Sequence, residues 1–185
     1  MTKLPDNPLY IKPEEVLVAF YLNQRPDSEG RMIEQIWSWD YESLEYTHDY
    51  IQWLFPLKQR SRFNPDAPLL NEAAIQAFRT NEPLRSHLRQ SFEVMLGFYG
   101  LQCNERGNGQ IEVTKSDKYR ERKTVWLKRG NHNYLRITRI LTSLNLLGLE
   151  DYAQAFFNGL DQIYSEQSDR IGSETYAFWK NAASD

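Results

Sequence analysis

The stretch NHNYLRITRILTSLNLLG, residues 131–148, has the sequence pattern of a buried helix. Its apolar residues cover most of a helix circumference, which is typical of a helix buried on nearly all sides. Four polar residues share its one remaining face at spacings i, i+4, i+7 and i+11: His132, Arg136, Arg139 and Ser143. Because an unpaired buried charge costs several kcal/mol, the two arginines need protein partners or a ligand.

A second stretch, HDYIQWLFP at residues 48–56, packs three large aromatics and two aliphatics beside a histidine and a glutamine. We expect one helix that starts at an Asp40 cap and ends at the proline closing this stretch. On that helix Glu45, His48 and Gln52 lie at i, i+3 and i+7 and share one face. We therefore interpret the second stretch as mainly a core helix, in which His48 and Gln52 are the polar exceptions.

We expect the two polar faces to meet. In one interpretation Arg136 or Arg139 pairs with Glu45 as network partner, and His48 and Gln52 complete a hydrogen-bonded network. In the other, the arginines line a pocket for an anionic ligand, since guanidinium groups suit carboxylate or phosphate. The candidate ligand-binding residues are His48, Gln52, Trp53, His132, Asn133, Arg136 and Arg139. A histidine or tryptophan at such positions also fits an ordinary core.

Helical patterning runs along almost the whole chain. It predicts an all-α, compact multi-helix domain with about seven to eight helices. One helix carries an apolar face made of Leu84, Leu88, Phe92, Met95 and Tyr99 and stops at Gly100. Near residues 100–118 a Gly-Asn-Gly turn beside a β-prone segment predicts a short irregular or hairpin-like insertion. The length fits a single domain over residues 1–185, with its core at roughly 15–180.

Charge is distributed unevenly along the chain. The net charge is −3, yet residues 115–139 hold nine Lys/Arg and two Asp/Glu. The candidate basic patch consists of Arg120, Arg122, Lys123, Lys128 and Arg129. Basic residues interleaved with aromatics suit nucleic acid or an acidic partner, although a run of charges is usually a solvated face. A nucleic-acid or acidic-partner role is therefore a second alternative.

No catalytic, cofactor-binding or metal-binding motif is present. Glycine-rich phosphate loops, nucleophile elbows and metal-ligand spacings are absent, so we assign no catalytic residue, cofactor or metal. The first alternative is an enzyme that acts on a phosphorylated or nucleotide substrate with His132 or His48 as acid–base. The single Cys103, the lack of a signal-peptide core at the N-terminus and the lack of an apolar membrane-spanning run favour the cytoplasm.

Four blocks carry a resemblance to a known family: FYLNQRPDSEGRMIEQI (20–36), HDYIQWLFPL (48–57), FEVMLGFYGL (92–101) and NHNYLRITRILTSLNLLGLE (131–150). In order and spacing they resemble the opioid growth factor receptor conserved-domain family. The resemblance covers most of the chain.

The resemblance implies a mostly helical domain and a compact single-domain member of microbial type. Animal members of the family are described as receptors for an enkephalin peptide, associated with the nuclear envelope. This chain carries no obvious nuclear-localisation cluster. We therefore expect a non-enzymatic ligand- or partner-binding domain. Its partner would be a small anionic ligand or a peptide, held between the helix expected over residues 40–56 and the helix expected over residues 131–148.

Overall fold

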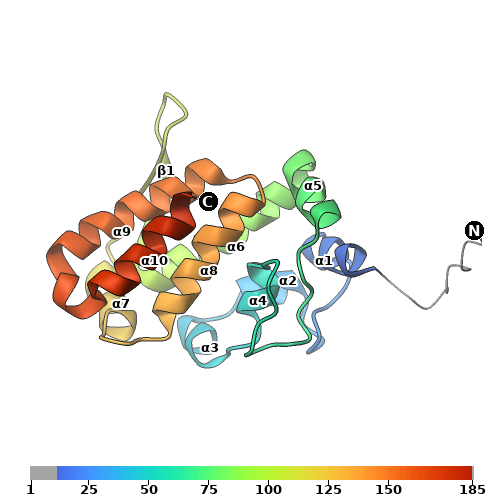
Figure 1. The fold of residues 1–185 in the computed structure, drawn as a ribbon, viewed down its shortest axis with the longest axis horizontal. Helices are drawn as coiled ribbons and strands as arrows, with labels where there is room; N and C mark the ends of the chain where they lie inside the picture. The colour runs from blue at the N-terminus through green and yellow to red at the C-terminus, as the bar shows by residue number, and fades with distance from the viewer. Residues whose placement is uncertain (1–11, 185) are drawn as a thin grey trace, which may run out of the picture.

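The computed structural model describes residues 12–184, so most of the N-terminal segment examined for a signal peptide lies outside the described residues. That part of the chain contains ten helices and one two-stranded sheet (Figure 1). The elements in order are α1 (Pro13–Tyr21), α2 (Ile33–Trp37), α3 (Tyr41–Tyr46), α4 (Ile51–Leu54), α5 (Glu72–Thr80), α6 (Glu82–Tyr99), β1 (Leu101–Glu105), β2 (Ile111–Lys115), α7 (Tyr119–Trp126), α8 (Asn133–Leu146), α9 (Glu150–Ile171) and α10 (Ser173–Ser184). The predicted helical class is confirmed.

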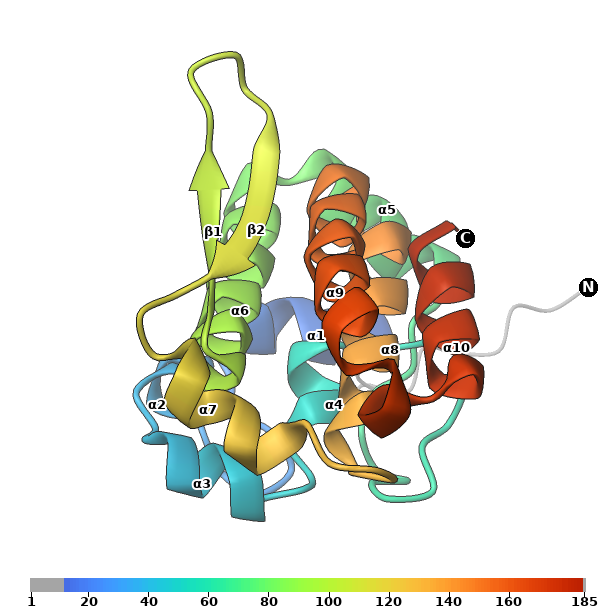
Figure 2. The ribbon, with the colours of Figure 1, turned by 90° about the vertical axis from the view of Figure 1, so that its left-hand side faces the viewer.

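The insertion is a β-hairpin. β1 and β2 pair antiparallel with Cys103 opposite Val113, and the hairpin tip projects beyond the helices (Figure 2). β1 packs against α6 and β2 against α9, so the hairpin joins the two helices. A Cβ on Gly159 would lie 2.9 Å from the Val113 carbonyl oxygen. The missing side chain thus lets α9 approach β2 closely.

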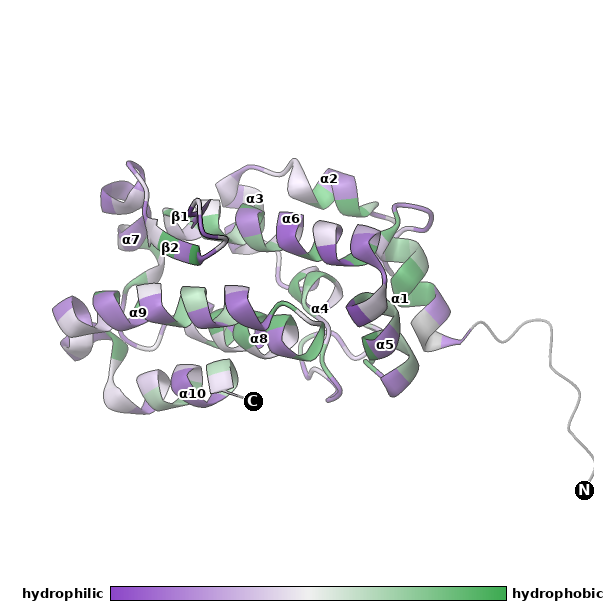
Figure 3. Cartoon of the chain, turned by 90° about the horizontal axis from the view of Figure 1, so that it is seen from above, coloured by the Kyte–Doolittle hydropathy of each residue, from purple (hydrophilic) through white to green (hydrophobic). Residues whose placement is uncertain are grey.

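The helices form two groups around one connected hydrophobic core. α8, α9 and α10 pack pairwise in neighbouring rows when seen from above (Figure 3). α6 forms the other group with α1, α2 and α5. The predicted apolar face of α6 is fully buried. α6 ends at Gly100, whose φ of 77° is the left-handed conformation that glycine favours.

The prediction of a single helix from Asp40 through the second stretch is wrong. Asp40 does cap a helix, since its carboxylate accepts a hydrogen bond of 2.8 Å from the Ser43 N–H. That helix, α3, ends at Tyr46, and Thr47 is extended at φ −90° and ψ 132°. A separate short helix, α4, follows. This break and the separate α7 raise the helix number above the expected seven to eight.

α8 is buried as its sequence predicts, with one exception. Ile137, Ile140, Leu141 and Leu144 are completely buried. Leu135, which the apolar pattern places with them, is 65% exposed. One apolar residue of α8 therefore faces outward beside the polar face of the helix.

Candidate anion-binding groove

Arg136 binds the backbone at the point where α3 ends. Its guanidinium donates hydrogen bonds to the carbonyl oxygens of Leu44 at 2.9 Å and Thr47 at 2.7 Å. It also lies 3.1 Å from His48 Nδ1, and only 6% of the residue is exposed. Carbonyls at the end of a helix lack helical partners, so the arginine acts as their cap. Arg136 therefore has a structural role and is already rich in hydrogen-bond partners.

The expected pairing of an arginine with the Glu45 carboxylate is wrong. That carboxylate accepts a hydrogen bond of 3.0 Å from Asn133 Nδ2, and its other oxygen lies 3.5 Å from His132 Nε2. Arg136 reaches only the Glu45 backbone carbonyl, at 3.4 Å. Glu45 does join the network, but through the side chains at the start of α8.

Two histidines lie together at this end of α8. The rings of His48 and His132 meet edge to face, with centroids 5.2 Å apart. Because a guanidinium only donates, His48 Nδ1 is the acceptor in its contact with Arg136. Burial lowers the pKa of His132 below its usual 6.5, and Glu45 opposes that shift. The pair is thus held beside a carboxylate and a buried guanidinium.

Arg139 lies in a different environment from Arg136. Its Nη1 donates a hydrogen bond of 3.0 Å to the Phe55 carbonyl oxygen, and one turn later Ser143 donates one of 3.1 Å to the Pro56 carbonyl. Among the described residues, no carboxylate lies within 4.0 Å of the Arg139 guanidinium. Burial lowers the pKa of Arg139 to about 10. This guanidinium is therefore desolvated without a protein anion to compensate it.

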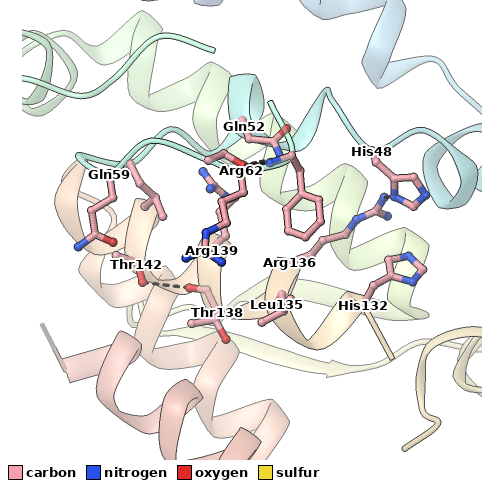
Figure 4. A pocket seen from close by; sticks show the side chains of 13 residues that line it. His48, Gln52, Gln59, Arg62, His132, Leu135, Arg136, Thr138, Arg139 and Thr142 are labelled. Atoms are coloured by element: carbon pink, nitrogen blue, oxygen red, sulfur yellow. Dashed lines mark hydrogen bonds between the residues drawn. The ribbon is translucent and has the colours of Figure 1, made fainter. Parts of the chain in front are cut away.

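A groove of about 540 Å³ opens between α8 and the segment around α4 (Figure 4). On the α8 side its wall consists of His132, Leu135, Arg136, Thr138, Arg139 and Thr142. The facing wall consists of His48, Gln52, Leu57, Gln59, Ser61, Arg62 and Phe63. Among the described residues that line the groove there is no Asp or Glu, whereas three of them are arginines. The groove is consequently a cationic site with an apolar rim.

The segment 57–63 was missed at the sequence level. It precedes a proline-rich turn and shows no periodicity, so its only signal was the adjacent Arg62 and Phe63. Among the described residues, Arg62 has no hydrogen-bond or ion-pair partner, and Phe63 is 74% exposed. The Gln52 amide lies 3.4 Å from Ser61 Oγ, which connects this segment to α4.

Two candidate residues do not line the groove. Trp53 is 3% exposed, packs against the Phe20 ring at a centroid distance of 5.1 Å, and borders a separate pocket of about 380 Å³. Asn133 is completely buried, and its side-chain amide donates a hydrogen bond to the Glu45 carboxylate. The structure thus brings His48, Gln52, His132, Arg136 and Arg139 together at the groove.

The basic patch is smaller than expected. Arg122 is buried, donates a hydrogen bond of 2.8 Å to the Phe98 carbonyl, and lies over the Tyr41 ring, so it does not belong to the patch. Arg120, Lys128 and Arg129 are exposed, and Lys123 is half-buried. Binding of nucleic acid or an acidic partner by these residues stays a prediction.

Over residues 12–184, the structure contains no group of three or more His, Cys, Asp or Glu that could hold a metal ion. None of the helices in that range is long and apolar enough to cross a membrane.

Fold and site together define a mostly helical domain with an arginine-lined groove beside α8. The chain belongs to the opioid growth factor receptor family, whose conserved region matches residues 12–179. This confirms the resemblance carried by the four sequence blocks.

Among its relatives, the human opioid growth factor receptor is 38% identical over 139 residues, 73% of this chain and 20% of the relative. The rat receptor is 40% identical over 141 residues, which are 73% of this chain and 23% of the rat receptor. The opioid growth factor receptor-like protein 1 of Xenopus tropicalis is 39% identical over 139 residues, 73% and 26%. The chain thus spans about a fifth to a quarter of the length of these relatives. No solved structure matches the chain.

Proposed function

We propose that this chain is a non-enzymatic binding domain whose groove between α4 and α8 holds an anionic group. The observation that carries the proposal is Arg139, a desolvated guanidinium with one carbonyl partner and no carboxylate partner among the described residues. An anion in the groove would supply the missing charge, with Arg62 facing it from the opposite wall. The relatives are named receptors, which supports a binding role.

The proposal assigns different roles to the groove residues. Arg139 holds the anion, and Arg136 positions the chain around His48 through its carbonyl contacts. Gln52 and His132 border the site and orient the bound group. One connected hydrophobic core supports treating the chain as a single domain. The free thiol of Cys103 suits the reducing cytoplasm, which we include in the proposal.

The test is native mass spectrometry of protein purified without refolding, followed by thermal denaturation with inorganic phosphate, phenyl sulfate and phenyl phosphate. A retained mass, or a saturable anion-dependent rise in Tm, should disappear in Arg139→Met. Lys128→Met removes an exposed cation outside the groove and should respond as the wild type does. If none of the anions raises Tm, or if Arg139→Met responds normally, the groove is not an anion site.

A second candidate function is supported by the contact of His132 with Glu45. A histidine with a carboxylate partner at the edge of a cationic groove is suited to acid–base chemistry on a phosphoester. The measurement is hydrolysis of p-nitrophenyl phosphate and bis(p-nitrophenyl) phosphate by wild type and by His132→Gln. Turnover that His132→Gln loses while it still binds phenyl phosphate would favour the enzyme. Equal background rates would exclude this role of His132 for these substrates.

A further inference from the structure

We propose that the ligand of this groove is a phosphomonoester dianion carried on a flat apolar or aromatic body. The proposal rests on the proposed function and specifies its ligand class. It is argued from two independent features, namely the charge left uncompensated in the groove and the apolar side chains on its two rims.

The charge of the groove favours a dianion. Arg136 directs its donors to backbone carbonyls, and Asn133 bridges its guanidinium to the Glu45 carboxylate, whose negative charge offsets that of Arg136. Arg139 and Arg62 remain, and neither has a carboxylate partner within 4.0 Å among the described residues. A dianion matches these two charges, whereas a carboxylate or sulfate monoester would leave one of them uncompensated. Arginine forks on opposite walls also suit the several terminal oxygens of a phosphate.

The apolar rim favours a flat body attached to that phosphate. Four large hydrophobic side chains are exposed among the described residues, and two of them, Phe63 and Leu135, belong to this groove. Phe63 belongs to the loop segment that forms one wall of the groove, whereas Leu135 belongs to α8, which forms the other wall. A planar group inserted between them would cover both side chains. A bare inorganic ion would leave them in water.

Matched probes separate the two features. Isothermal titration calorimetry at about pH 8, where a phosphomonoester is doubly charged, compares phenyl phosphate with phenyl sulfate, which has the same shape and one charge less. Inorganic phosphate supplies the dianion without the ring. We expect phenyl phosphate to bind about tenfold more tightly than phenyl sulfate and about fivefold more tightly than inorganic phosphate.

Two exposed residues provide variants that should fold normally. Arg62→Met should reduce the preference for phosphate over sulfate from about tenfold to about twofold or less. Phe63→Ala should weaken phenyl phosphate about fivefold and leave inorganic phosphate unchanged. Lys128→Met again controls for loss of a surface charge.

The outcomes distinguish this inference from the proposed function. Equal binding of phenyl phosphate and phenyl sulfate, both lost in Arg139→Met, would overturn the dianion and leave an anion-binding groove. A phosphate preference that persists in Arg62→Met would also overturn the assignment. If none of the three probes binds the wild type, the proposed function and this inference both fail.

Discussion

Replacing Arg136 with methionine should destabilise the protein much more than the same change at Arg139. The variant keeps the length of an apolar stem but removes the donors to the Leu44 and Thr47 carbonyls and the partner of His48. A buried acceptor left without its partner costs about 1–3 kcal/mol. For two carbonyls and the lost ring contact, the sum is about 3–5 kcal/mol. Such a loss is a large fraction of the stability of a typical domain.

Arg139→Met is the matched control because it removes one donor, that to the Phe55 carbonyl, and leaves α3 untouched. It should cost at most about 1–2 kcal/mol, because the lost hydrogen bond is offset by the removal of a desolvated charge without a carboxylate partner. Urea denaturation followed by far-ultraviolet circular dichroism measures both variants. With a slope of about 3 kcal/mol per molar, Arg136→Met lowers the midpoint by about 1–1.7 M and Arg139→Met by at most about 0.5 M. Equal losses in the two variants, or a loss below about 1 kcal/mol in Arg136→Met, would refute a capping role for Arg136.

Three further predictions follow from single contacts. Gly100→Ala should lower the free energy of unfolding by at least about 3 kcal/mol, because the residue has a positive φ and the added Cβ would lie 2.6 Å from the α7 backbone. Gly109 also has a positive φ but has open space around it, so Gly109→Ala should cost only about 1 kcal/mol when the urea midpoints of the two variants are compared. Folding lowers the pKa of His132, so the stability that its neutral ring contributes is present above about pH 6.5 and is lost as the pH falls. If the urea midpoint of His132→Gln depends on pH in the same way as that of the wild type, this prediction is wrong. Asn145→Ala should cost about 1–3 kcal/mol, because Asn145 donates a hydrogen bond of 2.7 Å to the Ala182 carbonyl and joins α8 to α10, and a thermal midpoint equal to that of the wild type would count against it.

The periodic parts of the sequence were sufficient for the helical class. The apolar face from Leu84 to Tyr99 and the left-handed stop at Gly100 are local signals, and both occur as predicted. The burial of Leu135 was not predicted correctly, since the apolar pattern of α8 places it in the core and the structure leaves it exposed on the groove rim. Periodicity identifies a helix but does not decide whether a neighbouring segment covers each apolar residue.

The candidate site likewise has features that the sequence predicts and features that depend on the fold. The sequence placed polar residues on one face of α8 and near α4, and it required partners for Arg136 and Arg139. It could not show that Arg136 would cap the end of α3, because that contact joins residues about 90 positions apart. It also could not place Arg62 in the groove, since the position of an aperiodic loop depends on what it packs against.

The sequence alone predicted a helical chain, an irregular or hairpin-like insertion near residues 100–118 and the need of two arginines for partners, because these follow from spacing, turn residues and the cost of buried charge. Only the tertiary structure decided which arginine is satisfied. Folding brings carbonyls at the end of α3 to Arg136, whereas Arg139 meets one carbonyl at a groove whose described lining holds no carboxylate. The difference between a structural arginine and a candidate binding arginine therefore depends on long-range contacts.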